Sequence, residues 1–410
     1  MTNDLKKVII IGAGAAGCFA AIEIKRLRPD VQVTLVEKGK RPLAKVAITG
    51  GGRCNLTNSF AQVKSMEHVY PRGHRLMKKL FHHFSHEDAY DWFEKSGIRL
   101  TTQEDECVFP QSQDAMEIVN NLLWQIRKSG VQILTETKAE VLQQKEDEFV
   151  LITNKGELRA DKVLVATGGH PSAAGYDFLS TLDIELIPLQ PSLFSFCLDN
   201  AKLKELMGTV VKEAQVSLPG TKLKAEGALL ITHWGISGPA ALKLSSYAAR
   251  ILAEKNYVAE ISIKWLCEDQ QDIQEELYEL SIRNSDKKVT SVYPQAFNAR
   301  LWAHLISRSS ISPDARWKAL NGKDMNRLLN TLTNDTYHMT GKNRFKDEFV
   351  TSGGVSLNSL NQKTLEAKNH KGLYFAGEVT DVDAITGGFN LQAAWTMGHV
   401  AAQGICKEDE

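Results

Sequence analysis

The sequence has no excess of charge of either sign. Lysine and arginine together number 49 and acidic residues also number 49, so the formal net charge is zero. This balance provides no global attraction to nucleic acid or to an anionic membrane. Apart from a short glycine-interrupted stretch at the N-terminus, no apolar segment approaches the length of a membrane span. We therefore expect neither a nucleic-acid partner nor a membrane partner.

The sequence also lacks paired cysteines and familiar hydrolytic or metal motifs. No CxxC pair occurs among the six cysteines, Cys18, Cys54, Cys107, Cys197, Cys267 and Cys406. That spacing fits neither a zinc site nor a disulfide framework, so a cytoplasmic location is the default expectation. No Ser/His/Asp order, no Walker lysine and no His/Glu cluster with metal-ligand spacing is present. The sequence predicts no metal site.

A glycine motif at the N-terminus predicts a dinucleotide-binding turn. "VIIIGAGAAG" contains G-x-G-x-x-G directly after an apolar run. It predicts a buried strand over 7–11 and a helix over 15–27, rather than the secretory signal peptide that this stretch resembles. The next stretch, "VQVTLVEKG", predicts an alternating strand that ends at Glu37. Strand, turn, helix, strand and acidic residue all have the required spacing.

Each residue type in this turn has a physical role in nucleotide binding. Gly12 permits the tight turn, Gly14 lets backbone N–H groups approach a pyrophosphate, and Gly17 allows close packing of helix on strand. The N-terminus of the helix carries a partial positive charge that favours the phosphates. Glu37 is placed to accept hydrogen bonds from a ribose, and it disfavours a 2′-phosphate. The turn by itself does not separate FAD from NAD.

The C-terminal stretch "GLYFAGEVTDVDAITGGFNLQAAWTMGHVAAQG" favours FAD. It predicts a short buried strand ending at Glu378 and a helix that opens at Gly387 and Gly388. In FAD folds such an acid contacts the ribitol, and the helix N-terminus stabilises negative charge on the reduced flavin. The alternative is a strand–helix unit whose glycines serve only close packing. "KVLVATGG", residues 162–169, follows a predicted hairpin and is typical of the end of the first half of an FAD-binding domain.

With these motifs placed, the chain resembles the HI0933-like (YhiN/BaiN-like) NAD(P)/FAD-dependent flavoproteins, within the glutathione-reductase-like FAD superfamily. One departure is "TLEAK" at 364–368, where the family has a run like T-M-E-S-K, so no polar catalytic role is assigned to it. The resemblance covers the whole chain in order and is carried by "GAGAAG" (12–17), "GGGRCNLTN" (50–58), "THWGISGPAAL" (232–242), "TSGGVSL" (351–357) and "GLYFAGEVTDVDAITGGFNLQAAWTMG" (372–398).

The resemblance implies an α/β fold with a discontinuous, Rossmann-like FAD-binding domain. Its two parts would be residues 1–190 and 342–410, with an inserted substrate or cap region at 191–341 that is first β-barrel-like and then helical. The sequence agrees, since "AQVSLPGTKLKAEGALLITHWG" predicts strands, and "QAFNARLWAHLI" and "DMNRLLNTLTN" predict helices. No second G-x-G-x-x-G is present, so NAD(P)H is expected at most as a transient donor.

The expected cofactor contacts come from the glycine turns, the acidic strand ends and the "GGGRCN" loop. This loop would lie near the flavin ring, with glycine amides facing anionic groups of the cofactor. The residues expected to bind FAD are Gly12, Gly14, Ala15, Ala16, Gly17, Glu37, Lys38, Gly51, Gly52, Arg53, Cys54, Asn55, Thr167, Gly168, Gly377, Glu378, Gly387, Gly388, Phe389, Asn390 and Leu391.

No catalytic residue is assigned from the sequence, although three are candidates. Arg53 would pair with a phosphate or an anionic substrate, or simply close a turn. Cys54 would be a redox thiol or a small buried residue, and no neighbour in the sequence supplies a resolving partner. His233 would donate a proton or serve the structure. Asp381 and Asp383 would tune the flavin or cap the loop before the last helix.

The leading hypothesis is an FAD-dependent oxidoreductase that transfers a hydride between flavin N5 and a small organic substrate, with NAD(P)H as a possible donor. One alternative is an FAD/NADH-dependent tRNA-modifying enzyme, which the neutral charge disfavours. Another is a non-catalytic FAD-binding redox protein. Members of similar sequence have activities as unlike as aminoacetone oxidation and reduction of unsaturated oxo-steroids. The sequence therefore specifies neither the substrate nor the oligomeric state.

Overall fold

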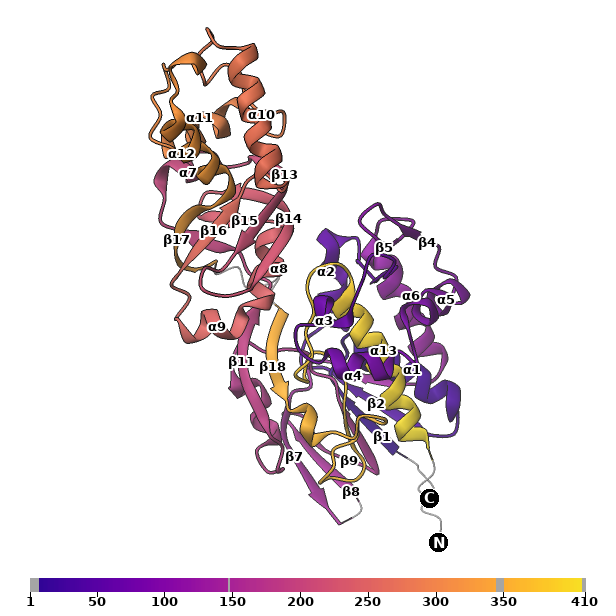
Figure 1. Ribbon diagram of the computed structural model, residues 1–410. Helices are drawn as coiled ribbons and strands as arrows, with labels where there is room; N and C mark the ends of the chain where they lie inside the picture. Colours follow the sequence, from indigo (N-terminus) through magenta and orange to yellow (C-terminus); the bar gives the residue numbers. More distant parts are fainter. Residues whose placement is uncertain (1–6, 147, 344–349, 408–410) are drawn as a thin grey trace. The chain divides into compact units, whose positions relative to one another are not determined.

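A five-stranded parallel sheet, built from both ends of the chain, forms the centre of the first of two units (Figure 1). The computed structural model describes residues 7–146, 148–343 and 350–407. The first unit is Met1–Pro191 with Val350–Glu410, and the second is Ser192–Phe349. In spatial order the strands of the central sheet are β19 (Leu373–Phe375), β10 (Lys162–Val165), β1 (Lys7–Ile11), β2 (Gln32–Val36) and β6 (Gln132–Leu134).

The N-terminal strand–turn–helix forms as its sequence predicts. Strand β1 and helix α1 (Ala15–Leu27) have the predicted bounds. Strand β2 differs from the prediction, because its four residues from Val33 to Val36 are all buried rather than alternating. Both faces of a central parallel strand are covered by other elements, so its residues are apolar or buried throughout. In the central sheet, β1 lies between β10 and β2, and every strand pairing is parallel.

The C-terminal helix α13 (Phe389–Cys406) packs along α1. A Cβ atom built on Gly398 would lie 2.8 Å from the carbonyl oxygen of Ala16, so the two backbones approach closely. Phe19 and Trp395 also pack together, with ring centroids 5.6 Å apart. The remaining helices of the unit are α2 (Ala44–Gly52), α3 (Met66–Val69), α4 (His74–Leu80), α5 (His86–Lys95), α6 (Ala115–Lys128), and the short 3-10 helices η1 (Ala173–Leu179) and η3 (Leu357–Ser359).

Three smaller sheets complete the first unit. The predicted hairpin over 148–163 is confirmed and belongs to the antiparallel sheet β7-β8-β9, which packs against the central sheet through Leu142, Phe149 and Leu151. The strands outside the central sheet are β3 (Thr57–Asn58), β4 (Leu100–Thr102), β5 (Cys107–Pro110), β7 (Ala139–Lys145), β8 (Glu148–Thr153), β9 (Gly156–Ala160), β11 (Leu186–Ser192) and β18 (Val350–Val355), and β11 pairs with β18.

The second unit contains a closed six-stranded barrel, which confirms the predicted barrel-like insertion. All its pairings are antiparallel, and residues alternate between interior and exterior along β13 and β17. The barrel order is β12 (Phe196–Leu198), β15 (Gly235–Ser237), β14 (Lys224–Thr232), β13 (Val210–Ser217), β16 (Ala259–Lys264) and β17 (Asp335–Lys342).

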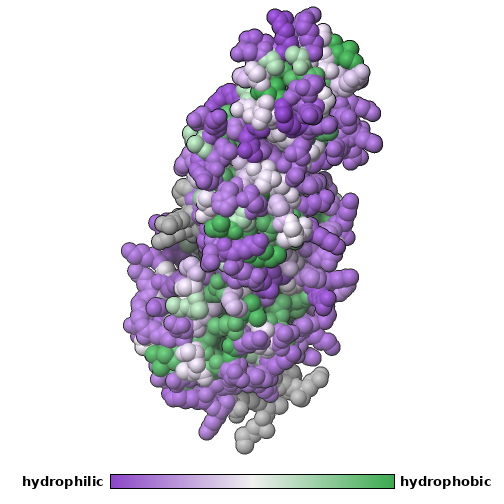
Figure 2. All heavy atoms as spheres, turned by 60° about the vertical axis from the view of Figure 1, so that its left-hand side comes forward, coloured by the Kyte–Doolittle hydropathy of each residue, from purple (hydrophilic) through white to green (hydrophobic). Residues whose placement is uncertain are grey.

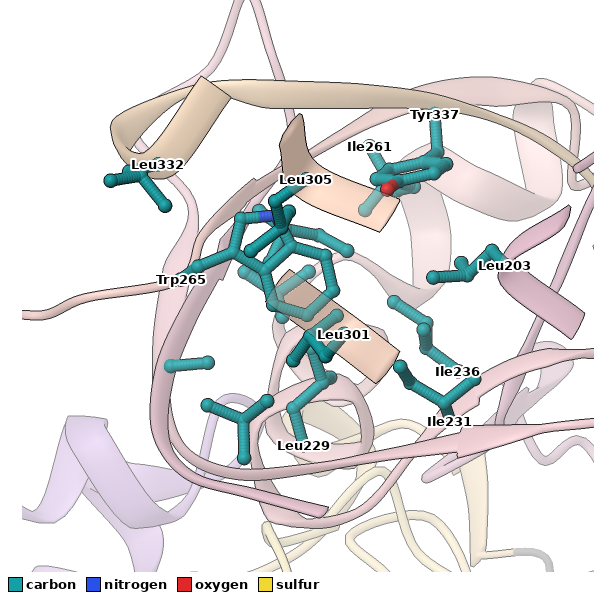
Figure 3. Packing of buried hydrophobic residues seen from close by; sticks show 14 of the residues in the cluster. Leu203, Leu229, Ile231, Ile236, Ile261, Trp265, Leu301, Leu305, Leu332 and Tyr337 are labelled. Carbon is teal, nitrogen blue, oxygen red and sulfur yellow. The ribbon is translucent and has the colours of Figure 1, made fainter. Parts of the chain in front are cut away.

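Helices of the second unit share one apolar core with the barrel (Figure 3). Trp265 lies in the middle of this core beside Leu301, Leu305 and Tyr337, and its indole N–H donates to Asp335 at 3.0 Å. The two helices predicted around residues 299 and 325 are present. The helices of this unit are α7 (Ala201–Lys204), α8 (Pro239–Tyr247), α9 (Ala249–Glu254), α10 (Gln270–Arg283), α11 (Ala299–Arg308), η2 (Trp317–Ala319) and α12 (Gly322–Thr333).

Hydrophobic residues occur on the surface in small groups. On the face shown in Figure 2, hydrophilic residues cover most of the area and hydrophobic ones are interspersed among them. Within the described residues, no helix combines the length and the apolar character that crossing a membrane requires.

Candidate active site

The glycine-rich turn after β1 contains three glycines that differ in their surroundings. Gly12 has φ +106°, and a Cβ there would lie 2.4 Å from the carbonyl oxygen of Ala166 on the neighbouring strand. A Cβ on Gly17 would lie 2.0 Å from the carbonyl oxygen of Gly12. Around Gly14, by contrast, no described heavy atom lies within 4 Å of the added Cβ. Gly12 and Gly17 are thus required by the fold itself, whereas Gly14 borders open space where a ligand can approach the backbone.

Helices α1 and α13 both begin without a side-chain cap. Gly14 and Gly388 occupy the cap positions, and neither helix start receives a side-chain cap hydrogen bond among the described residues. In α5, α6, α11 and α12, by contrast, the first free N–H groups are satisfied by the side chains of Ser85, Asp114, Asn298 and Asn321. The free N–H groups of α1 and α13 are therefore available to an anionic ligand.

The starts of these two helices face the same end of the unit. Contacts run in the same direction along both helices, from Ala16 with Gly398 to Ile24 with Cys406. Helix α13 starts nine residues before Gly398, which corresponds to about 14 Å of helix. Helix α1 starts one residue before Ala16, so the two N-termini are offset by about 12 Å along the helix direction. This separation suits an extended ligand with a pyrophosphate at one end and an electron-accepting ring at the other.

Glu37 follows β2 and is held beside the glycine turn. Its carboxylate accepts hydrogen bonds from the backbone N–H groups of Ala13 at 3.0 Å and Gly39 at 2.7 Å. The chain then returns to the same turn, because the N–H of Leu43 donates to the carbonyl oxygen of Ala13 at 2.8 Å. These bonds orient the carboxylate at the edge of the turn, where the ribose of a dinucleotide lies in this type of fold.

The loop that contains "GGGRCN" has an unusual backbone. Helix α2 loses helical geometry at Thr49, which has ψ 149°, and Gly50, Gly51 and Gly52 then have φ values of +59°, +69° and +83°. Left-handed conformations at three consecutive residues favour glycine strongly. A Cβ on Gly50 would lie 2.9 Å from Asn55 N, whereas Gly51 and Gly52 have no described atom within 4 Å. These two glycines border open space, as Gly14 does.

Asn55 ties this loop to the start of α13. With its amide oriented to satisfy both neighbours, the side chain accepts from the N–H of Gly388 at 3.2 Å and donates to the carbonyl oxygen of Thr57 at 3.0 Å. Asn58 adds a second connection, since its amide donates to the carbonyl oxygen of Gly387 at 3.1 Å and accepts from Phe60 N at 2.9 Å. Both asparagines hold the loop against the turn that precedes α13.

In the structure, Arg53 and Cys54 are in contact with other groups of the protein. The exposed Arg53 guanidinium lies 4.4 Å from the ring centroid of Phe109 and donates to the carbonyl oxygen of Gly50 and to Gln113. Cys54 is fully buried with φ +62°, and burial raises the pKa of its thiol to about 12, against a smaller opposing effect of a hydrogen bond with Thr49. The thiol is therefore protonated at neutral pH.

Glu378 and the turn after β10 meet at a third part of the site. The Glu378 carboxylate accepts from the N–H of Thr351 at 2.7 Å and lies 3.5 Å from the Lys45 ammonium. A Cβ on Gly169 would lie 2.4 Å from this carboxylate. The buried Thr167 hydroxyl has no hydrogen-bond partner among the described residues. Burying a hydroxyl without a hydrogen-bond partner costs free energy, so the Thr167 hydroxyl is a candidate for a hydrogen bond to a bound ligand.

The loop between β19 and α13 is fixed from several sides. Asp383 and Arg72 form a buried ion pair, and the N–H of Gly353 donates to Asp381 at 3.1 Å. Asn390 both accepts from and donates to the backbone of Ala384, at 2.9 and 3.0 Å. The two aspartates thus hold neighbouring segments of chain rather than cap α13, which is one of the roles that the sequence left open.

These features define an FAD-binding site of the Rossmann-like type. The residues present fit the cofactor, because open space borders Gly14, Gly51 and Gly52, the N-termini of α1 and α13 lack caps, and Thr167 presents an unpaired hydroxyl. No group of three or more His, Cys, Asp or Glu residues in the described chain is arranged to hold a metal ion. The fold and these residues fit the class of Rossmann-like FAD-binding flavoproteins.

Comparison with known proteins places the chain within a family of this class. Residues 6–404 match the model described as the HI0933-like protein Rossmann domain, and the chain belongs to that family. It is 31% identical to the ribosomal RNA dihydrouridine synthase of Escherichia coli K12, over 97% of each chain. It is 26% identical to the 3-dehydro-bile acid delta(4,6)-reductase of Clostridium scindens, over 97% of this chain and 98% of that protein.

Solved structures agree on the fold. The 3-ketosteroid-delta4-(5alpha)-dehydrogenase of Rhodococcus jostii, in complex with 4-androstene-3,17-dione, superposes with a TM-score of 0.51. The match covers 98% of this chain and 97% of that one, at 14% identity. At this identity the similarity concerns the architecture alone.

Two residues named from the sequence, His233 and Lys38, form no hydrogen bond or ion pair with the site residues described above, and two residues that contact Glu378 were not named from the sequence. His233 lies in the second unit, exposed at the turn between β14 and β15, with its ring 4.4 Å from that of Trp234. Lys38 is exposed. Lys45 and Thr351 were not named from the sequence, although both contact Glu378. Thr351 begins "TSGGVSL", so the family motif was the available signal for it.

Proposed function

We propose that this protein reduces a carbon–carbon double bond conjugated to a carbonyl group, and that its substrate is a uridine of ribosomal RNA. Support for the substrate comes from sequence similarity across the full length, since two curated relatives, at 31% and 27% identity, are ribosomal RNA dihydrouridine synthases. The proposal replaces the small organic substrate expected from the sequence, and a neutral net charge does not oppose it, because RNA binding depends on local charge.

The reaction class is common to both kinds of relative. Formation of dihydrouridine saturates the C5–C6 bond of uracil, which is conjugated to the C4 carbonyl. The name of the bile acid reductase likewise describes reduction of double bonds, in a substrate that carries an oxo group. In such a reduction a hydride adds to the carbon remote from the carbonyl, and a proton adds to the neighbouring carbon. We propose NAD(P)H as the donor, so that one NAD(P)H and one proton are consumed per double bond.

FAD, when bound, supplies hydride transfer at its N5 atom. The chain's own residues have the tasks of binding and orientation. In this proposal Gly14 and the start of α1 bind the pyrophosphate, and Glu37 binds the ribose. Glu378 binds the ribitol, and the free N–H groups at the start of α13 stabilise negative charge at the pyrimidine edge of the ring. The first unit is the FAD-binding domain, and the second contributes the substrate or cap region.

The observation that carries this assignment is the start of α13. Gly387 and Gly388 have φ values of +129° and +89°, and Asn55, Asn58 and Asn390 fix their segment through backbone hydrogen bonds. The N-terminus of α13 is fixed and has no side-chain cap, and the N-terminus of α1 lies at the same end of the unit. The N–H groups of α13 are therefore preorganised donors for an anionic ring edge. Preorganised donors of this kind stabilise charge that develops during a reaction.

An activity assay on unmodified ribosomal RNA tests the proposal. The holoenzyme is first mixed anaerobically with NADH or NADPH, and loss of the oxidised flavin absorbance identifies the donor. It is then incubated with in vitro transcripts of the small-subunit and large-subunit ribosomal RNAs, and nucleosides are analysed by mass spectrometry. We expect dihydrouridine, heavier than uridine by two hydrogen atoms. Absence of dihydrouridine, together with reduction of an unsaturated 3-oxo-steroid, would instead favour a free small-molecule substrate.

A further inference from the structure

The segment from Phe60 to His86 concentrates positive charge in a chain that is neutral overall. It contains five lysines and arginines and five of the eleven histidines of the chain, against a single acidic residue, Glu67. The segment includes α3 and α4 and belongs to the first unit. A local basic surface of this kind is the electrostatic footprint of a nucleic-acid site, even where the whole protein has no net charge.

The cations of α4 lie on one exposed face of the helix. Arg75, Lys78 and Lys79 belong to α4, and His82 follows its end. Lys78 and Lys79 are three and four residues after Arg75, His82 is four residues after Lys78, and all four side chains are exposed. Arg75 and Lys78 form no ion pair or hydrogen bond with any described side chain, whereas Lys79 donates to Gln362. Some exposed cations elsewhere are paired, as in Lys288 with Asp314 and Lys318 with Asp286.

The same segment carries aromatic rings that are partly exposed. Phe60 stacks on His86 with ring centroids 4.6 Å apart, and its edge meets Phe81 at 5.2 Å. All three rings are half-buried. Phe60 has φ +59°, a backbone conformation that is uncommon for a large side chain. Aromatic rings beside cations are the usual combination in sites that bind single-stranded RNA.

This basic segment borders the candidate active site. Phe60 contacts Phe389, the first residue of α13, with centroids 5.1 Å apart. The Tyr70 hydroxyl donates to the carbonyl oxygen of Phe389 at 2.9 Å, and Arg72 forms its ion pair with Asp383. Helix α4 contacts α13 directly (Figure 1). A polyanion on α4 would therefore lie next to the helix start that we assign to the flavin.

On this basis we propose that the exposed face of α4, formed by Arg75, Lys78 and His82, binds the phosphate backbone of the ribosomal RNA next to the target uridine. The inference rests on the proposed function, since it identifies the surface through which that substrate is recognised. Lysine and arginine neutralise phosphates and release counterions, which makes affinity depend on salt. The half-buried rings of Phe60 and Phe81 would offer surfaces on which an unpaired base beside that backbone can stack.

The test compares two double charge reversals of equal size. The variant Arg75→Glu/Lys78→Glu changes the α4 face. The control Lys138→Glu/Lys145→Glu changes two exposed lysines of the same unit, one just before β7 and one at its end, and the side chain of neither forms an ion pair or hydrogen bond with a described residue. Affinity for the ribosomal RNA transcripts is measured by filter binding over a series of salt concentrations, with flavin content and the rate of flavin reduction by NAD(P)H as checks on folding.

We expect the α4 variant to bind the transcripts at least about ten-fold more weakly at low salt, and its log–log salt slope to fall by about 1.4, from two lost contacts of ~0.7 each. Its KM for the RNA should rise while flavin reduction stays unchanged, and the control should match the wild type. If the wild type forms dihydrouridine and the α4 variant does so with unchanged KM and salt slope, the inference fails alone. A wild type that neither binds nor reduces the RNA overturns the proposed function as well.

Discussion

The side chain of Asn55 and the backbone N–H of Gly388 form a hydrogen bond of 3.2 Å, which joins the glycine-rich loop after α2 to the cap position of α13. The same place explains why residue 388 is glycine. A Cβ there would lie 2.2 Å from the carbonyl oxygen of Thr57 and 2.7 Å from the Asn55 side chain. Packing against the protein's own backbone, rather than against a flavin, therefore restricts this position.

Gly14→Val and Gly388→Val are expected to lose FAD for different reasons. Gly14 has an ordinary φ of −86° and open space around it, so valine blocks the ligand and leaves the fold intact. Gly388 has φ +89° and a backbone clash, so valine destabilises the fold as well. Flavin absorbance after purification and thermal unfolding of the FAD-free proteins separate the two effects.

The matched control for these substitutions is Gly322→Val. Gly322 opens α12 and, like Gly14, has no described atom within 4 Å of the added Cβ, but it lies in the other unit. It should retain FAD fully. Full flavin occupancy in Gly14→Val would show that the pyrophosphate lies elsewhere.

Glu23 makes stability depend on acidic pH. Burial by itself raises the pKa of Glu23, but hydrogen bonds from His399 and Trp92, together with the charges of Arg26 and His399, outweigh burial and bring the pKa below its ordinary value of 4.5. The fold thus stabilises the ionised form. This contribution is present above pH 4.5 and is lost as the pH falls through the lowered pKa.

Glu23→Gln should therefore lower the free energy of unfolding at pH 7 by about 2 kcal/mol, the scale of hydrogen bonds to a charged group. The difference from the wild type should narrow at a second, acidic pH below the lowered pKa, because the carboxyl of the wild type is then protonated. Urea unfolding at the two pH values measures both effects. Glu140→Gln, at an exposed position of β7, should change neither value, and an equal loss at both pH values would contradict this account.

Breaking the Arg72–Asp383 pair should be costly because both side chains are nearly buried, at 9% and 1% exposure. Arg72→Met leaves a carboxylate in the interior, and we expect a loss of about 3 kcal/mol. The double variant Arg72→Met/Asp383→Asn should lose less than the sum of the two single variants, as measured by denaturant unfolding. Lys95→Met removes an exposed pair, with 79% and 67% exposure, and should cost less than about 0.5 kcal/mol. Additive losses would show that the two residues act separately.

Cys54 should be inert toward alkylation in the native protein. With a pKa of about 12, only about one thiol in ten thousand is ionised at pH 8, and the sulfur is also buried. Mass spectrometry after treatment with iodoacetamide should find Cys54 unmodified in the native holoenzyme and modified in urea. Rapid labelling of the native protein with loss of flavin reduction would instead restore the redox-thiol hypothesis.

The sequence predicted the elements whose signals are local. Strand β1, helix α1 and the hairpin β8–β9 follow from periodicity and glycine spacing. It also predicted the family and the barrel-like insertion. The residues of the candidate site that the sequence did not predict are placed there by long-range contacts. Lys45 and Thr351 contact Glu378 from distant parts of the chain, and neither the residues around Lys45 nor the motif that begins at Thr351 identifies Glu378 as the partner.

By itself the sequence determined the FAD-binding class. The nucleotide turn, the acidic strand end and the uncapped helix start are each encoded by a short contiguous stretch of residues. Tertiary structure decided what each of those residues does. Gly14 borders open space whereas Gly388 packs on Thr57, and Cys54 is a buried thiol rather than a thiolate. Steric limits and desolvation arise only when separate segments meet, so no local pattern encodes them.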